Sequence, residues 1–204
     1  MARLGIFGGT FDPPHLGHLI LGQEACFQLD LDRLLWVVTA DPPHKTDSQL
    51  APVEARMAMV LAAIEGNAYF ELSRIEVDRP GPHFAVDTLR LLRERYPDDE
   101  LIYLIGGDSL RDLPDWNEPL EFIQTYDALG VMRRPDDQVD LDRLEAVLPG
   151  LTERLRFVDA PLLDISSSQL RRRIRAFHPV QYYMPPAVLE LIIERRLYRD
   201  NVPA

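Results

Sequence analysis

Uninterrupted apolar runs alternate with segments of helical periodicity along the chain. The run RLGIFGG at 3–9 ends in glycines, the pattern of a buried strand, and the stretch from Leu16 to about Leu29 has the apolar spacing of a helix. The alternation then repeats. It predicts strands at 3–9, 33–40, 70–77, 100–107, 127–133 and 154–160. It predicts helices at 16–29, 52–64, 84–96, near Leu120, and at 141–148, 166–177 and 186–198.

Strands that alternate with helices indicate an α/β fold, a doubly wound parallel sheet covered by helices on both faces. In such a sheet, ligands bind beyond the carboxyl ends of the strands, where the crossovers change direction. No low-complexity linker interrupts the 204 residues. We therefore expect a single domain over 1–204, with the C-terminal helices from about residue 166 packed on it.

The composition is that of an ordinary globular protein, with 46% hydrophobic and 27% charged residues. The start of the chain has neither a signal-peptide core nor a membrane span, so we expect a cytoplasmic protein. The single cysteine, Cys26, excludes an internal disulfide, and no Cys/His cluster has zinc spacing. The sequence predicts no protein-built metal site and no membrane partner.

The formal net charge of −11 argues against a nucleic-acid partner, which requires a basic surface. A small anionic substrate remains compatible with this charge, provided that local donors hold it. The few clusters of Arg, Lys and His therefore carry the information about function. The sequence does not indicate the oligomeric state.

The first such cluster is GIFGGTFDPPHLGH at 5–18. Gly8 and Gly9 allow a ligand to approach the backbone at a strand end, and the helix that follows points its free N–H groups at the same space. His15 and His18 lie on one side of the first helical turn, so both imidazoles can donate to one anionic group. Singly, each histidine is more simply a helix cap or a satisfied surface residue. Their combined spacing with the glycines and prolines favours an anion site over those readings and over a metal site.

The second cluster is ISSSQLRRRI at 165–174. Ser166 or Ser167 as N-cap would leave the first N–H groups of a helix open to a phosphate, Ser168 adds a hydroxyl, and Arg171 could clamp the anion. The alternative is a capped helix with a solvated arginine face.

These two motifs resemble the nucleotidyltransferase superfamily, which carries His-x-x-His at the first position and Ile-Ser-Ser-Thr-x-x-Arg at the second. The resemblance implies a Rossmann-like nucleotidyltransferase fold, with His15 and His18 stabilising the transferring α-phosphate of ATP without a covalent intermediate. It implies that the β- and γ-phosphates bind at the second motif. The implied ATP-binding residues are Gly8, Gly9, Thr10, Phe11, His15, His18, Gly106, Asp108, Ser166, Ser167, Ser168 and Arg171.

Further features look like the bacterial nicotinate mononucleotide adenylyltransferases. Pro42-Pro43-His44-Lys45 offers Lys45 to the acceptor's phosphate, and Trp116 offers a flat indole to a pyridine ring. The segment from Phe84 and Ala85 to Thr88 stands where that family binds the nicotinate, with Phe and Ala in place of Tyr and Thr. Arg133 and Arg134 match the family and are expected to face ATP.

The resemblance implies transfer of AMP from ATP to nicotinate mononucleotide, giving deamido-NAD and pyrophosphate, with Mg²⁺ neutralising the triphosphate. Two alternatives stay open. One is a sister adenylyl- or cytidylyltransferase with another phosphate acceptor, such as phosphopantetheine. The other is a nucleotide-sensing module that retains the fold and has lost turnover.

Overall fold

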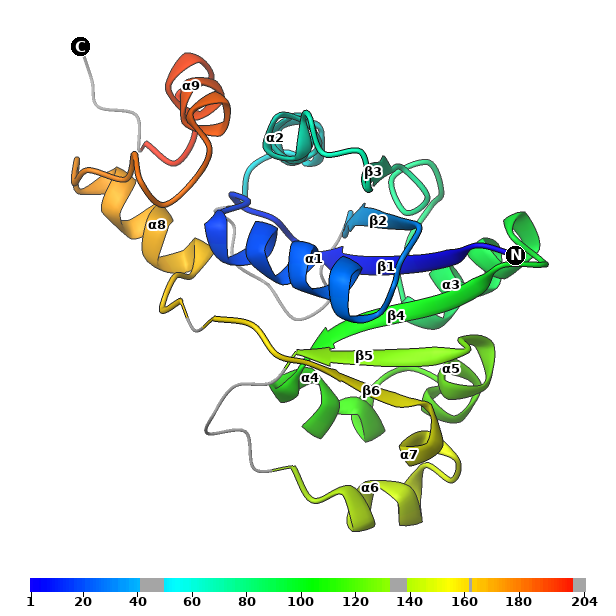
Figure 1. Cartoon of the computed structure of the whole chain (residues 1–204). Coiled ribbons are helices and arrows are strands. Elements are labelled where there is room, and N and C mark those ends of the chain that lie inside the picture. Colours follow the sequence, from blue (N-terminus) through cyan, green and yellow to red (C-terminus); the bar gives the residue numbers. More distant parts are fainter. Residues whose placement is uncertain (41–49, 133–138, 162, 200–204) are drawn as a thin grey trace.

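The computed structural model describes residues 1–40, 50–132, 139–161 and 163–199. Its centre is a six-stranded sheet in the order β3-β2-β1-β4-β5-β6, and every neighbouring pair is parallel (Figure 1). The strands are β1 Arg3–Gly9, β2 Arg33–Val38, β3 Phe70–Ser73, β4 Glu100–Gly106, β5 Ala128–Met132 and β6 Leu155–Val158. The helices are α1 Leu16–Gln28, α2 Val53–Ile64, α3 Ala85–Arg95, α4 Gly107–Arg111, α5 Pro119–Thr125, α6 Leu141–Val147, α7 Leu151–Arg154, α8 Ser167–Arg175 and α9 Pro186–Glu194, with a 3₁₀ turn η1 at Leu113–Asp115. The predicted doubly wound fold is confirmed.

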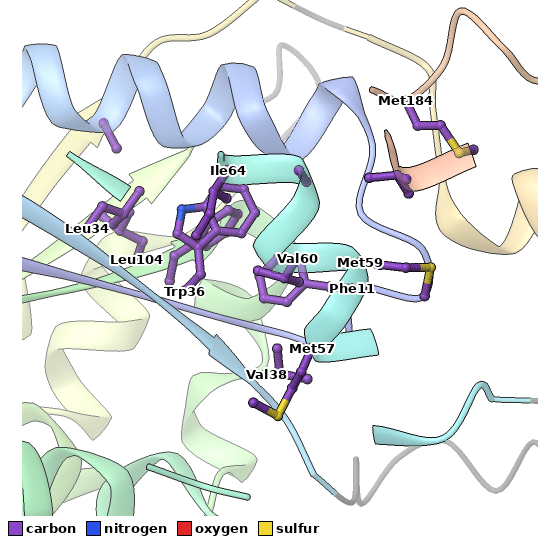
Figure 2. Close-up of a cluster of buried hydrophobic side chains, with 14 of the residues drawn as sticks. Phe11, Leu34, Trp36, Val38, Met57, Met59, Val60, Ile64, Leu104 and Met184 are labelled. Carbon is purple, nitrogen blue, oxygen red and sulfur yellow. The ribbon is translucent and has the colours of Figure 1, made fainter. Parts of the chain in front are cut away.

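Each face of the sheet has its own hydrophobic core. Successive residues of a strand point to opposite faces, so Ile6 and Phe7 of β1 enter different clusters. One cluster packs against α1, α2, α8 and α9, and Figure 2 shows part of it around Phe11, Trp36 and Met59. The other packs against the helices from α3 to α7. This two-sided burial explains why the strands read as nearly continuous apolar runs.

Several predicted elements end one or two residues early, and two, β3 and α9, end four residues earlier than expected. β3 stops at Ser73 instead of residue 77, because its only neighbour is β2, and the paired register ends at Val37 and Ser73. The chain then turns, and Glu76 is buried at 5% exposure. α9 stops at Glu194 instead of 198, and Tyr198 takes a left-handed backbone conformation with φ of 62°.

Three short elements, α4, η1 and α7, were not predicted. They span five, three and four residues. Segments of this length show too few apolar repeats for a periodicity to be recognised. They occupy the connections on the β4 to β6 side of the sheet (Figure 1).

The C-terminal helices share the core of the sheet. Leu170 and Ile174 of α8, and Val188 and Ile192 of α9, belong to the same buried cluster as Phe11. The C-terminal helices thus pack on the sheet, and the single domain over 1–204 stays a prediction. Among the described residues, no helix is both long and apolar enough to cross a membrane.

Candidate active site at the carboxyl ends of the strands

The chain reverses its direction of strand addition between β1 and β4. β1 lies between β2 and β4 in the sheet. The chain that follows β1 crosses to one face of the sheet, and the chain that follows β4 crosses to the other. This is the position where doubly wound sheets bind ligands. β1 ends at Gly8-Gly9 and β4 at Gly106, so the predicted glycines meet at this point.

The three glycines differ in the space that a side chain would have at each position. A Cβ on Gly9 would lie 2.7 Å from the Phe11 ring, and one on Gly8 would lie 3.0 Å from the Tyr103 hydroxyl. A side chain at Gly9 would therefore displace the Phe11 ring, and one at Gly8 would require a small shift of Tyr103. A Cβ on Gly106 would meet nothing within 4 Å. Among the described residues, Gly106 thus faces open space, and its contact with a nucleotide stays a prediction.

The loop after β1 carries a buried aromatic ring. Phe11 is 2% exposed, its φ is 48°, and its ring makes an edge contact with His18 at a centroid distance of 5.1 Å. Because this ring is in the core, Phe11 can contact ATP only through its backbone, and its side chain positions His18. The Thr10 carbonyl accepts a 3.0 Å hydrogen bond from Arg56 Nη1.

His15 and His18 stack at the start of α1. Their ring centroids are 3.8 Å apart with an interplanar angle of 32°. The backbone N–H of His15, the N-cap residue, donates to Nδ1 of His18 over 3.2 Å. Since Nδ1 accepts, the ring proton of neutral His18 is on Nε2, which is therefore a donor.

Burial sets the charge of the other imidazole. His15 is 5% exposed, and desolvation lowers its pKa from 6.5 to about 4. His15 is therefore neutral at pH 7 and adds no repulsion to the ring stacked on it. The pair offers hydrogen-bond donors aimed by the protein, without a fixed double positive charge.

The second motif lies directly beside this loop. Of the two candidate N-caps, the structure selects Ser166, whose side chain accepts from the Gln169 N–H at 3.2 Å. The Ser167 hydroxyl donates to the Pro13 carbonyl at 2.9 Å, across 154 positions of sequence. The N-termini of α1 and α8, where the sequence predicts two anion sites, are thus brought together by a tertiary contact.

Arg171 is bound to protein groups. Its side chain is 7% exposed, its Nη1 donates to the Asp12 carbonyl oxygen at 2.8 Å, and the same atom lies 3.5 Å from Asp12 Oδ2. Its Nη2 donates to the Ser168 hydroxyl at 3.4 Å. The contact of Arg171 with phosphate stays a prediction, and the structure gives the guanidinium a different partner, the loop that precedes His15.

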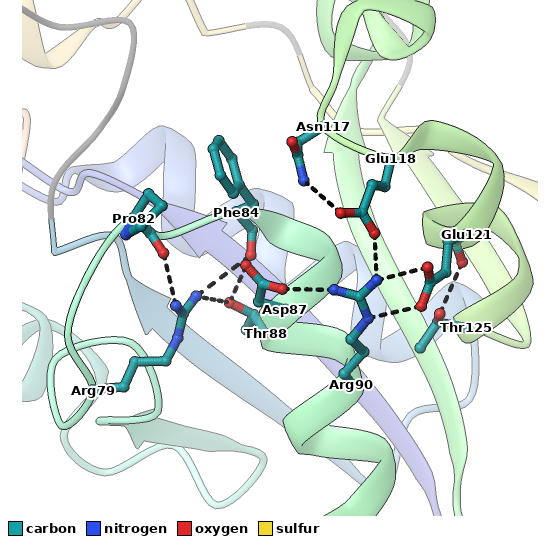
Figure 3. A network of polar contacts seen from close by, with 10 residues as sticks. All are labelled: Arg79, Pro82, Phe84, Asp87, Thr88, Arg90, Asn117, Glu118, Glu121 and Thr125. Carbon is teal, nitrogen blue, oxygen red and sulfur yellow. Dashed lines mark hydrogen bonds and ion pairs between the residues drawn. The ribbon is translucent and has the colours of Figure 1, made fainter.

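On the acceptor side, Thr88 is also engaged internally. It is 1% exposed, and its hydroxyl donates to Glu76 Oε1 at 2.8 Å. Arg79 donates to the carbonyls of Pro82 and Phe84 and to the Thr88 hydroxyl, as Figure 3 shows. Burial raises the pKa of Glu76. Thr88 therefore supports the start of α3, and a ligand there would meet the backbone of Phe84 and Ala85 and the half-buried Phe84 side chain.

Trp116 and Asp108 follow β4. The Trp116 ring makes edge contacts with Phe122 at 5.1 Å and Tyr103 at 6.5 Å, and the residue is half-buried. The indole is thus anchored on the core and still partly open. Asp108, in the first turn of α4, accepts from Arg111 at 3.1 Å, and its side chain is 57% exposed.

The sequence did not predict the internal contacts of two buried residues, Arg56 and Glu76, and of the half-buried Tyr198. Arg56, 2% exposed, donates to the carbonyls of Thr10, Thr39, Ala40 and Ala51 at the ends of β1 and β2 and before α2. Glu76 was placed inside a strand, and Tyr198 inside a helix. The one available signal was an arginine in the apolar run VEARMAMVLAAI, where a charge needs buried partners.

Lys45, Arg133 and Arg134 lie outside the described residues, so their roles stay predictions. Within the described ranges, no group of three His, Cys, Asp or Glu side chains is arranged to hold a metal ion.

Parallel strands, two convergent helix N-termini and a stacked histidine pair define a nucleotidyltransferase site. In agreement, a family model described as cytidylyltransferase-like matches residues 6–173. A protein of Thermomicrobium roseum named "probable nicotinate-nucleotide adenylyltransferase" is 44% identical over 98% of this chain and 92% of its own length. A Bacillus pumilus protein of the same name is 41% identical over 98% of this chain and 100% of its own.

A solved structure shares the fold. The Plasmodium falciparum nicotinic acid mononucleotide adenylyltransferase complexed with NaAD superposes with a TM-score of 0.81 at 20% identity, covering 97% of this chain and 98% of its own. Because the sequence relatives match over nearly their whole length, this chain belongs to the nicotinate-nucleotide adenylyltransferase family.

Proposed function

We propose that this chain transfers AMP from ATP to nicotinate mononucleotide, giving deamido-NAD and pyrophosphate. The observation that carries the proposal is the stacked His15–His18 pair at the N-terminus of α1, beside the N-terminus of α8. The two helix ends offer separate sites for the α-phosphate and for the β- and γ-phosphates of one triphosphate.

The chemistry needs little from a protein base. A phosphate oxygen of the acceptor attacks the α-phosphorus of ATP, the bond from that phosphorus to the oxygen bridging to the β-phosphate breaks, and pyrophosphate leaves. The nucleophile is already an anion, so no proton has to be removed. Catalysis is then positioning of the two phosphates and stabilisation of the charge that develops between them.

His18 is assigned the contact to the transferring phosphate through Nε2–H, since its Nδ1 is occupied by the His15 backbone. His15 lies beside it as a neutral donor at pH 7. Ser166, Ser167 and Ser168 at the start of α8 receive the leaving pyrophosphate. These donors stay fixed during the reaction, which is why they stabilise the transition state.

The acceptor lies on the other side of β1. The backbone at Phe84 and Ala85 receives the nicotinate group, and Trp116 supports the pyridine ring. Lys45 is assigned the acceptor phosphate, and Arg133 and Arg134 the ATP side, on sequence grounds alone. Gly106 and Asp108 border the nucleoside between the two substrates.

We expect MgATP as the donor substrate, in the cytoplasm. Asp12 is already surrounded by Arg171, Tyr198 and the Ala51 N–H, so it does not fit as a metal ligand. The ion would therefore be held mainly by the triphosphate and water, and would supply charge neutralisation of the leaving group.

The test is pyrophosphate release from MgATP with each of three acceptors: nicotinate mononucleotide, nicotinamide mononucleotide and phosphopantetheine. We expect the highest kcat/KM with nicotinate mononucleotide. Turnover with phosphopantetheine alone would assign a sister transferase. ATP binding without turnover of any acceptor would assign a nucleotide-sensing module instead.

A further inference from the structure

We propose that Tyr198 and Asp12 are positioning residues for ATP, and that Arg171 acts on ATP through Asp12. The C-terminal turn after α9 would then fix the relative position of the two phosphate-binding helix ends. This inference rests on the proposed function, because it assigns the two helix ends to one triphosphate.

Asp12 is the meeting point of four distant segments. It is 1% exposed. Its Oδ1 accepts from the Tyr198 hydroxyl at 2.6 Å and from the Ala51 N–H at 3.2 Å. Arg171 Nη1 binds its carbonyl oxygen at 2.8 Å and lies 3.5 Å from its Oδ2. The buried carboxylate therefore depends on the two hydrogen bonds to Oδ1 and on the Arg171 charge beside Oδ2, which has no hydrogen-bond partner among the described residues.

The conformation of the C-terminal turn places Tyr198 at this carboxylate. Tyr198 has φ of 62°, in the left-handed region, which is unfavourable for a bulky residue. Such a residue persists where the surroundings fix it, and conformations of this kind cluster at functional sites. Here the hydroxyl contact with Asp12 and a 3.9 Å contact with Met59 Sδ hold the side chain.

The same contacts connect the two helix ends. Arg171, in the second turn of α8, binds Asp12 three residues before His15. Ser167 at the start of α8 binds the Pro13 carbonyl at 2.9 Å, and the Leu16 N–H at the start of α1 binds the Tyr183 carbonyl at 2.9 Å. The N-termini of α1 and α8 are therefore both held by contacts of the loop from Asp12 to Leu16.

Loss of the Tyr198 hydroxyl leaves one buried carboxylate lone pair without its donor. The loop can relieve that cost by shifting toward water, which changes the spacing of the α1 and α8 ends. A triphosphate spans both ends, whereas the acceptor lies at α3 and beyond β4. The effect should therefore fall on ATP and spare the acceptor.

The experiment compares Tyr198→Phe with a matched control, Tyr182→Phe, in the connection between α8 and α9, where the residue is 83% exposed. Initial rates are measured with ATP and nicotinate mononucleotide varied in turn. We expect Tyr198→Phe to raise KM for ATP about tenfold, as for one lost hydrogen bond to a charged group, with KM for the acceptor unchanged. Tyr182→Phe should match the wild type. Equal rises in both KM values, or a lower melting temperature with both KM values unchanged, would overturn the proposal.

Two further variants test the route through Asp12. If Arg171 and Tyr198 act through this residue, the double variant Tyr198→Phe/Asp12→Asn should have the same KM for ATP as Asp12→Asn alone. Arg171→Lys should likewise add little to Asp12→Asn. Full additivity of Arg171→Lys would mean that Arg171 binds the phosphates directly. If Asp12→Asn does not fold, the Tyr198→Phe result decides alone.

Binding of a non-hydrolysable ATP analogue, measured calorimetrically without acceptor, separates this inference from the proposed function. If the wild type turns over no acceptor but the analogue binds more weakly to Tyr198→Phe than to the wild type, the positioning role is supported and the transferase function is rejected. Normal turnover with unchanged analogue binding in Tyr198→Phe would do the reverse.

Discussion

The donor and acceptor sides of the site are built in opposite ways. On the donor side, Asp12 is joined to Tyr198 and Arg171 across 186 and 159 positions. On the acceptor side, Thr88 is joined to Glu76 and Arg79 across 12 and 9 positions. The part of the proposed acceptor side around Thr88 is thus a local unit of one loop and the helix that follows, whereas the Asp12 contacts of the proposed donor side form only when both ends of the chain have folded together.

The difference matters for energetics. Arg56, which holds the strand ends next to the donor loop, is buried and donates four hydrogen bonds to backbone carbonyls. Arg90, on α3, pairs with three carboxylates at the surface, those of Asp87, Glu118 and Glu121 (Figure 3). Water can replace the partners of Arg90, whereas the contacts of Arg56 are buried or partly buried and less accessible to water.

Arg56→Met should therefore have the largest effect on stability. Four carbonyls would lose their donor, the buried one of Ala51 and the partly buried ones of Thr10, Thr39 and Ala40, and we expect a loss of about 4 kcal/mol in the free energy of unfolding, measured with urea. Arg56→Lys keeps the charge but has fewer donors, so its free energy of unfolding should lie between those of the wild type and Arg56→Met. A loss below about 1 kcal/mol for Arg56→Met would mean that water reaches these carbonyls.

His18→Ala tests the donor side by chemistry. Removing the Nε2 donor should lower kcat by about 10²- to 10³-fold, with much smaller changes in either KM, because the contact strengthens in the transition state. His178→Ala, at an exposed position, is the control. Equal losses in kcat and in substrate affinity would count against the assigned role.

The pKa of His15 predicts how the donor side responds to acid. The unfolded chain binds a proton near pH 6.5 and the folded chain only near pH 4, so acidification through this window favours unfolding. The difference amounts to on the order of 3 kcal/mol between pH 7 and pH 4. In His15→Gln, the free energy of unfolding should lack this part of the pH dependence. Parallel pH profiles for wild type and variant would contradict it, and His178→Gln should follow the wild type.

Thr88→Ala probes the acceptor side. The Glu76 carboxylate would lose its 2.8 Å donor, and we expect about 1 to 3 kcal/mol of stability to be lost. Because the contact supports the start of α3, KM for nicotinate mononucleotide should rise while KM for ATP stays constant. Thr88→Ser keeps the hydroxyl and should restore most of both properties. A rise in KM for ATP would show that the two sides are not separate.

Arg90→Gln should have the smallest effect. Its ion pairs lie at the surface, with the Arg90 side chain 35% exposed, and are screened by salt. We expect unchanged kinetics and a smaller shift in melting temperature than for Thr88→Ala, vanishing at high salt. A shift as large as that of Arg56→Met would overturn the contrast between buried and exposed arginines.

The sequence by itself determined the alternation of strands and helices, the parallel doubly wound sheet and the two phosphate motifs. Each of these depends on local periodicity or on residue types a few positions apart, which a single sequence displays directly. The pairing of His15 with His18 and the serine cap of α8 belong here, since both lie within one helical turn.

Only the tertiary structure decided what holds these motifs in place. The buried carbonyl contacts of Arg56, the Glu76–Thr88 pair, and the closure of Tyr198 and Arg171 on Asp12 join residues whose separation no local pattern records. Helical periodicity continues in the sequence to residue 198, but α9 ends at Glu194 in a turn with Arg196 in the left-handed region, closed by the Leu197 N–H on the Ile192 carbonyl. The contact of Tyr198 with Asp12, beyond this turn, joins residues 186 positions apart.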